Sequence, residues 1–541
     1  MTTAMKNTLA IICIVLFAST MYLLTLRGAP GNPTPATAEL LEGETNPFEL
    51  SPERGRFAHV MALGETGKYE LSQQLAEFVY PDVGYYNGKF YGYFAPGIAY
   101  MALPFYEWGK QYGMSQVFTF GFVSLMSILA LVFLYLIGRE ILGLPMWAAM
   151  LAVLIFAFGS TAWSYAITLY QHHVTTLFAL AAFYAAWRFK GGAKPGAPTA
   201  VVAPGSGWWG LVVWACYALA FTIDYPNIIL LLPVMVYFLL VSLRTETTDR
   251  GFRVALRPAA IITMVVFILI TAAHFSFNTE HFGGPTRLAG GIIGYKTILE
   301  NNLLNHPDPE AVIAAHAAQK DVVSFFREEN FPEGISVLFF SSDRGLFFYG
   351  PIFILAIFGA WRLARRKAAS SGEPRSPRFA GERGSLEVWS LIGLVLANIF
   401  LYASWGDPWG GWAYGTRYMT LTMSVLSLFV ASWLAAEPQK LWKKLLALVL
   451  FLYSSAIGLL GALTTNAIPP HSEAIGLKTG WNFLRNWEFF RNGRSGSFFY
   501  RVFASEQVSL TDYFALIYAA VVCVALVLLF VVPLFEHRHD D

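Results

Sequence analysis

Residues 7–26, NTLAIICIVLFASTMYLLTL, hold no charged side chain and are long enough to cross a bilayer as one helix. Similar runs recur along the 541-residue chain, which is 56% hydrophobic and only 13% charged. Its mean hydropathy is +0.50. A soluble domain cannot bury that much apolar surface, so the composition predicts an all-α polytopic membrane protein.

About twelve apolar runs have the length of a membrane helix. They lie near residues 7–26, 115–137, 145–165, 170–188, 207–223, 226–243, 257–275, 346–364, 387–404, 418–436, 442–464 and 512–534. No segment has the composition of a separate soluble domain, and no strong internal repeat is visible. We therefore expect residues 1–541 to form a single transmembrane domain, with the first run as an uncleaved anchor.

The basic residues predict the orientation of the chain. Lysine and arginine concentrate in four connections, near 188–194, 244–257, 362–383 and 440–444, which share one face if twelve spans are present. Basic loops stay in the cytoplasm, so both termini are predicted inside. The long loops 27–114, 276–345 and 465–511 are predicted outside, with short helices in the interface, one of them over residues 56–79.

Charge and cysteine content exclude several classes of protein. The formal net charge is +2, so nothing indicates nucleic acid as a partner. Cys13, Cys216 and Cys523 all fall inside apolar runs. They are expected to be small core residues, because neither a disulfide framework nor a metal cluster has that pattern.

The first outer loop carries the side chains best suited to chemistry. Glu53 and Arg56 open it, and Asp82 and Lys89 follow in a stretch rich in tyrosine and glycine. Carboxylates, cations and aromatic rings beside a lipid surface suit an enzyme that acts on a lipid-linked substrate. A simple pore needs no such loop.

Further ionisable residues lie at the predicted outer ends of other spans. They are His172 and His173, Asp224, Arg344 and Arg417. Ionisable groups at membrane depth are costly and by default indicate a functional site. Each also has a structural interpretation: interfacial histidines, a helix cap for Asp224, and arginines that reach headgroups. For Glu53 and Asp82 that interpretation is a solvated or ion-paired loop carboxylate.

The order of these motifs resembles the GT-C superfamily of polytopic glycosyltransferases, in particular the branch with protein O-mannosyltransferases and bacterial aminoarabinose transferases. The matching residues run in order through most of the chain: Glu53 with Arg56-Phe57-Ala58, Thr66-Gly67, Tyr91 to Gly97, Asn278-x-x-x-Phe282-Gly283-x-Pro285, Arg344-Gly345-Leu346-Phe347 and Gly410-Gly411-x-x-x-Gly415-x-Arg417-Tyr418. The chain departs from the pattern at Arg54, at Phe94, where members carry a lysine, and at His172-His173, where several carry an aspartate.

The resemblance implies transfer of a sugar, with inversion, from a polyprenyl-phosphate donor to an acceptor hydroxyl on the outer face. A carboxylate can take the proton of the acceptor hydroxyl, and arginine can meet the charge of the leaving phosphate. Glu53 is then the expected base, with Asp82 as the other candidate. The expected phosphate ligands are Arg56, Lys89, Arg344 and Arg417, helped by His172 or His173, with Asp224 also at the substrate.

Several points stay open at the level of sequence. The sugar is undetermined, and the acceptor is a glycan, a lipid or a protein. A divalent metal is not excluded, but no ligand spacing supports one. The main alternative is a secondary transporter or lipid flippase, since twelve helices with both termini inside is a common transporter plan. Against it, transporters show paired halves and broken helices at mid-membrane, whereas these ionisable residues gather at outer span ends.

Overall fold

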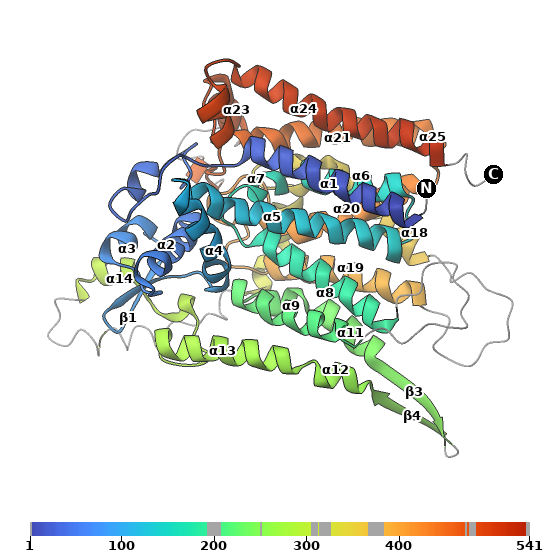
Figure 1. Ribbon diagram of the computed structural model, residues 1–541, viewed down its shortest axis with the longest axis horizontal. Helices are drawn as coiled ribbons and strands as arrows, with labels where there is room; N and C mark the ends of the chain where they lie inside the picture. Colours follow the sequence, from blue (N-terminus) through green and yellow to red (C-terminus); the bar gives the residue numbers. More distant parts are fainter. Residues whose placement is uncertain are drawn as a thin grey trace.

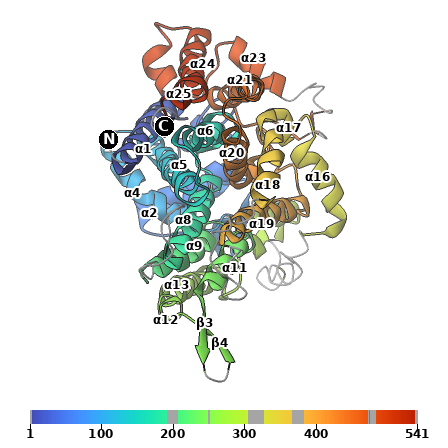
Figure 2. The ribbon, with the colours of Figure 1, turned by 90° about the vertical axis from the view of Figure 1, so that its right-hand side faces the viewer.

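The computed structural model describes residues 3–191, 207–248, 251–303, 312, 326–365, 383–470, 473–474 and 483–536. Within these ranges the chain forms a bundle of helices, seen from the side in Figure 1 and from one end in Figure 2. Seven of the described helices are long and apolar enough to cross a membrane, and three shorter apolar helices accompany them. The predicted all-α polytopic membrane architecture is confirmed. The count of twelve spans stays a prediction.

Each predicted apolar run contains at least one helix. The helices are α1 (Thr3–Thr25), α5 (Ser115–Leu136), α6 (Met146–Phe158), α8 (His172–Lys190), α9 (Trp209–Ile223), α11 (Leu232–Ser242), α12 (Pro258–Ile262) and α13 (Val265–Phe282), α18 (Ala356–Arg365), α19 (Arg383–Ala403), α20 (Thr420–Ala435), α21 (Leu441–Leu463), and α24 (Leu510–Leu526) with α25 (Val532–Glu536).

Some of these runs are interrupted where the sequence disfavours a continuous helix. Helix α6 ends at Phe158 before Gly159, and the short α7 (Ala162–Ala166) follows. Helix α17 (Leu346–Tyr349) ends before Gly350-Pro351, and a 3-10 turn (Pro351–Leu355) leads into α18. Proline cannot donate a backbone hydrogen bond, so Pro351 accounts for the second break, whereas the first falls at Gly159.

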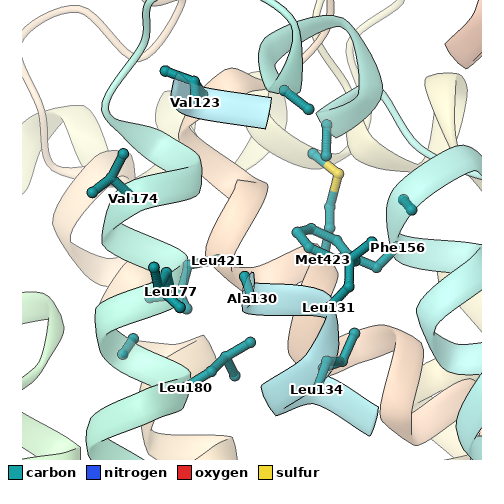
Figure 3. Close-up of a cluster of buried hydrophobic side chains, with 14 of the residues drawn as sticks. Val123, Ala130, Leu131, Leu134, Phe156, Val174, Leu177, Leu180, Leu421 and Met423 are labelled. Carbon is teal, nitrogen blue, oxygen red and sulfur yellow. The ribbon is translucent and has the colours of Figure 1, made fainter. Parts of the chain in front are cut away.

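Apolar side chains dominate the centre of the bundle, with a few buried hydroxyls such as those of Ser127 and Thr176. Helix α8 packs against α5, α9, α11 and α20. Figure 3 shows side chains of this core, with Val123, Ala130, Leu131, Leu134, Phe156, Val174, Leu177, Leu180, Leu421 and Met423 labelled. All of these side chains are buried, so the core at this level of the bundle is closely packed.

One end of the bundle is covered by the first loop (Figure 1). Its elements are α2 (Ser51–Thr66), α3 (Gln73–Val79), β1 (Val83–Tyr86), β2 (Lys89–Gly92) and α4 (Gly97–Gln111). Strand β1 also pairs with β5 (Ile293–Gly294), which precedes α14 (Tyr295–Glu300). The pairing joins the loop after α13 to the first loop and so builds one cap.

The expected single interfacial helix over residues 56–79 is wrong. Helix α2 begins at Ser51 and ends at Thr66, before Gly67, whose φ of +68° is left-handed, and α3 begins only at Gln73. Arg56 and His59 are buried along with Phe57 and Met61. Helix α2 is therefore enclosed by the cap on most sides and does not lie on the membrane surface with one apolar face.

The opposite end of the bundle carries both chain termini (Figure 1). The hairpin of β3 (Leu243–Thr248) and β4 (Gly251–Leu256) projects from this end as well. The remaining described elements are η1 (Ala38–Leu41), α10 (Asn227–Leu230), η3 (Ala289–Gly291), η6 (Glu328–Asn330), α16 (Phe331–Phe339), η8 (Arg417–Met419), α23 (Phe483–Arg491), η9 (Tyr500–Ala504) and η10 (Val527–Val531), with the π-helical turn η2 (Ile137–Ile141) after α5. The cap and the termini thus lie at opposite ends of the bundle.

Candidate active site

Glu53 lies in the first turn of α2, and its side chain is closed off from the surface. Pro52 suits the start of a helix, since its fixed φ is helical and its missing N–H has no partner there to lose. Glu53 has an exposed fraction of 0%. Neither carboxylate oxygen has a hydrogen-bond partner among the described residues. A buried carboxylate without partners is costly and indicates a functional group.

The surroundings of Glu53 favour its protonated form. The pKa of Glu53 is raised to about 7. Burial away from water is the main cause, and repulsion by the nearby Glu49 carboxylate adds to it. The Tyr170 hydroxyl lies next to the carboxylate and lowers the pKa of Glu53, although no hydrogen bond of standard geometry joins the two groups. Glu53 can therefore accept a proton near neutral pH.

Glu49 itself is held in a buried ion pair with Arg27. Its carboxylate also accepts hydrogen bonds from the backbone N–H of Thr45 at 3.0 Å and of Asn466 at 2.7 Å. Arg27 follows α1 directly and donates to the carbonyl of Gly461 at 2.9 Å. This pair ties the start of the first loop to α21 and fixes the chain just before α2.

Arg56 lies three residues after Glu53, on the same face of α2. Its guanidinium donates to the carbonyl of Pro52 at 2.9 Å and to the Oε1 of Gln171 at 2.6 Å, and it stacks on Phe94 at 4.6 Å. Burial lowers the pKa of Arg56 to about 10, so it remains charged at neutral pH. Phe94 occupies the position at which members of the resembled superfamily carry a lysine, and its ring packs against the guanidinium of Arg56.

Asp224 joins the same group of side chains through Gln171. The Nε2 of Gln171 donates to a carboxylate oxygen of Asp224 at 3.0 Å. Asp224 ends α9 and is partly buried, and burial raises its pKa against the opposing effects of Gln171, Arg56 and Arg417. The Gln171 side chain therefore links a carboxylate to Arg56.

Arg417 approaches from the far half of the chain. Its guanidinium lies 5.3 Å from the centre of the Tyr170 ring and 5.4 Å from that of Tyr418. Nε and Nη1 of Arg417 have no hydrogen-bond partner within the part of the chain that the structure describes. Arg417 therefore has donors left for an anionic ligand.

The two histidines have different surroundings. His172 stacks on Tyr170 with ring centres 6.0 Å apart, meets Tyr418 edge-on at 6.0 Å, and leaves its Nε2 unpartnered among the described residues. His173 places its Nε2 2.8 Å from the carbonyl of Ala162, in the bundle. Of the two, His172 is the one that contacts the aromatic side chains around Arg417.

Arg344 uses its donors within the protein. Its guanidinium donates to the carbonyls of Trp409 at 3.0 Å, Asp343 at 3.1 Å, Gly411 at 3.0 Å and Ile468 at 2.9 Å, and its exposed fraction is 1%. The guanidinium of arginine has five N–H donors, so it can donate hydrogen bonds to several carbonyl oxygens at once. Arg344 holds the loop before Arg417 against the segment after α21.

Asp82 and Lys89 lie in the cap outside this group of contacts. Asp82 follows α3 and accepts a hydrogen bond from the Ser51 hydroxyl at the start of α2. Lys89 begins β2, is about half exposed, and pairs with Glu70 at 3.2 Å. The structure thus connects Asp82 to the helix that carries Glu53, and Lys89 to another part of the cap.

Five of the residues predicted from the sequence, Glu53, Arg56, His172, Asp224 and Arg417, lie near one another in the fold. Tyr170, which the sequence analysis did not single out, neighbours four of them: Glu53, Arg56, His172 and Arg417. Glu49 and Arg27 were also missed, and only their burial reveals them. For a metal, no group of three or more His, Cys, Asp or Glu side chains among the described residues is arranged to hold an ion.

Comparison with known proteins gives similarity in structure only. No protein-family model and no curated protein matches the sequence. The fold is similar to ArnT from Cupriavidus metallidurans bound to undecaprenyl phosphate, at 15% identity and a TM-score of 0.46, over 96% of this chain and 76% of that chain. The apo state of that protein gives the same TM-score and identity, over 98% and 77%.

A second similar structure is the archaeal oligosaccharyltransferase AglB from Archaeoglobus fulgidus, in complex with an inhibitory peptide and a dolichol-phosphate. It has 15% identity and a TM-score of 0.42, over 84% of this chain and 55% of that chain. The present chain thus spans about half the length of AglB. The function proposed below rests on the residues of the site.

Proposed function

We propose that this protein is a membrane glycosyltransferase that moves a sugar from a polyprenyl-phosphate donor to an acceptor hydroxyl on the outer face. The observation that carries the proposal is a fully buried, unpartnered carboxylate next to Tyr170, whose ring centre lies 5.8 Å and 5.3 Å from the guanidiniums of Arg56 and Arg417. Glu53 supplies the carboxylate, and Arg56 and Arg417 supply the cations. ArnT and AglB, which carry undecaprenyl phosphate and dolichol-phosphate in their structures, support the choice of donor.

The proposed reaction is a direct displacement. The acceptor oxygen attacks the anomeric carbon while its proton passes to the Glu53 carboxylate. The bond between the anomeric carbon and the phosphate oxygen breaks, and the electron pair leaves with the lipid phosphate. Because attack and departure occur on opposite sides of the carbon, the product is inverted.

The charged groups of the site suit both changes of charge in the proposed reaction, the proton taken up by Glu53 and the negative charge on the leaving phosphate. A pKa near 7 lets Glu53 be ionised in part of the population and still hold a proton after transfer. Arg417, with unpartnered Nε and Nη1, offers paired donors to the leaving phosphate, and Arg56 adds a second positive charge. His172 has an unpartnered Nε2 and is proposed to assist at the phosphate.

The other predicted site residues take lesser roles in this proposal. Asp224 orients Arg56 through Gln171, and Arg344 holds the loop that presents Arg417. Asp82 remains the second candidate for the base, and Lys89 for a donor contact at the edge of the cap. Since Glu53 is enclosed in this structure, an acceptor reaches it only after covering side chains have moved.

The test is turnover by the purified protein in lipid nanodiscs with a panel of polyprenyl-phosphate sugars. We expect release of polyprenyl phosphate with at least one donor, loss of release in Glu53→Gln, and normal release in Glu39→Gln, an exposed glutamate of the same loop. A transporter would release no lipid phosphate with any donor. Full turnover by Glu53→Gln would move the base to Asp82.

A further inference from the structure

Tyr170 is the side chain on which the proposed site converges. It precedes α8, and its exposed fraction is 1%. The guanidiniums of Arg56 and Arg417 lie 5.8 Å and 5.3 Å from the centre of its ring. His172 stacks on it at 6.0 Å. One ring therefore contacts both cations and the histidine of the site.

Two guanidiniums that lie beside one ring repel each other, so another interaction must stabilise their arrangement. Arg417 disfavours the charge of Arg56, as expected for two cations in a buried region. An aromatic face attracts a cation, and the attraction strengthens away from water. Tyr170 thus offsets the repulsion before any phosphate has bound.

The hydroxyl of Tyr170 points to a second contact. It is buried next to the Glu53 carboxylate, and among the residues that are described neither group forms a hydrogen bond of standard length and angle. An unpartnered hydroxyl and an unpartnered carboxylate side by side form a pair that can close into a hydrogen bond. In that bond the hydroxyl donates to one carboxylate oxygen and leaves the other free for the acceptor.

We propose, on the basis of the proposed function, that Tyr170 is a positioning residue. Its ring holds Arg56 and Arg417 for a lipid phosphate. Its hydroxyl orients Glu53 toward the acceptor. The two halves of the proposal separate in two variants. Tyr170→Phe keeps the ring and removes the hydroxyl. Tyr170→Leu removes both.

The ring is tested by the binding of undecaprenyl phosphate, which needs no turnover. We expect Tyr170→Phe to bind within about twofold of wild type and Tyr170→Leu about tenfold more weakly, which corresponds to about 1.4 kcal/mol. Tyr112→Leu, at an exposed tyrosine after α4, serves as the matched control. Wild-type affinity in Tyr170→Leu would overturn the role of the ring, as would equal loss in both variants.

A variant that keeps the shape of the ring guards against misfolding. Tyr170→trifluorophenylalanine withdraws electron density from the ring face and so weakens its attraction for cations without opening a cavity. We expect its affinity for undecaprenyl phosphate to fall below that of Tyr170→Phe. Equal affinity in these two variants would show that the ring acts by packing alone, against the proposal.

The hydroxyl is tested by the protonation of Glu53. The charged and titratable groups that face Glu53 are Arg27, Glu49, Arg56, Tyr165 and Tyr170. The hydroxyl stabilises the carboxylate, so Tyr170→Phe raises the pKa of Glu53 and moves the acid limb of the pH–rate profile to higher pH. Infrared titration against Glu53→Gln follows the same group without turnover. An unmoved Glu53 titration in Tyr170→Phe would overturn this half of the proposal.

The outcomes separate this proposal from the proposed function. If wild type binds undecaprenyl phosphate and transfers no sugar, the transferase assignment fails while the binding and infrared results still judge Tyr170. If wild type transfers sugar and Tyr170→Leu binds lipid phosphate normally, the positioning role fails and the transferase assignment stands.

Discussion

Replacing Glu53 with glutamine is expected to stabilise the protein at alkaline pH while it destroys transfer. The fold raises the pKa of Glu53 from an ordinary value of 4.5 to about 7. At about 1.4 kcal/mol per pKa unit, keeping this carboxylate ionised inside the fold costs about 3 kcal/mol. A neutral amide of the same shape avoids that cost.

The sign of the pH dependence follows from the direction of the shift. A carboxyl whose pKa is raised on folding contributes its stability fully below about pH 4.5, and this contribution is lost as the pH rises through about 7. Wild type should therefore lose stability over that range relative to Glu53→Gln. Above pH 7 the difference is expected to level off near 3 kcal/mol.

The assay is thermal unfolding in detergent, followed by the fluorescence of the 16 tryptophans, at a series of pH values. Glu39→Gln is the control, because it makes the same substitution at an exposed glutamate of the same loop. The reasoning would be refuted if wild type and Glu53→Gln kept a constant difference in unfolding temperature from pH 4.5 to pH 8. It would also be refuted if the variant were the less stable protein at pH 8.

Substitutions at three other positions test the remaining contacts. Arg417→Ala should weaken undecaprenyl phosphate binding at least tenfold and Arg417→Lys less, and unchanged affinity in both would assign Arg417 to headgroup contact alone. Glu49→Gln should destabilise the fold by about 3–5 kcal/mol, because it leaves Arg27 buried without its counter-charge; equal thermal stability would contradict the buried pair. Gly55→Ala should reduce turnover, since a Cβ there would lie 2.3 Å from Phe94, the ring that supports Arg56; normal turnover would show that this support is dispensable.

The positions of the membrane helices were predictable because the signal is local. A run such as residues 115–137 carries its own length and hydrophobicity, and the structure begins α5 at Ser115. Asn87-Gly88 also predicts a tight hairpin between short aromatic strands, and both residues adopt positive φ between β1 and β2. This signal is local, but the charges of the loop, on which its interpretation rested, do not predict a hairpin.

The roles of individual site residues depend on contacts distant in sequence. Arg344 and Arg417 look equivalent in their motifs, yet Arg344 is enclosed by the carbonyls of Gly411 and Ile468 while Arg417 keeps unpartnered donors. Tyr170 resembles many tyrosines at span ends. Only the fold brings it between residues 56 and 417, so no pattern in its own neighbourhood identifies it.

The most direct test of the account is a cryo-EM map of the protein with undecaprenyl phosphate. The account predicts phosphate density within hydrogen-bond distance of Arg417 and close to Arg56 and the Tyr170 ring, with the Glu53 carboxylate facing the open side of the phosphate. Density for the phosphate at the end of the bundle that carries the termini, with no lipid beside Arg417, would contradict it.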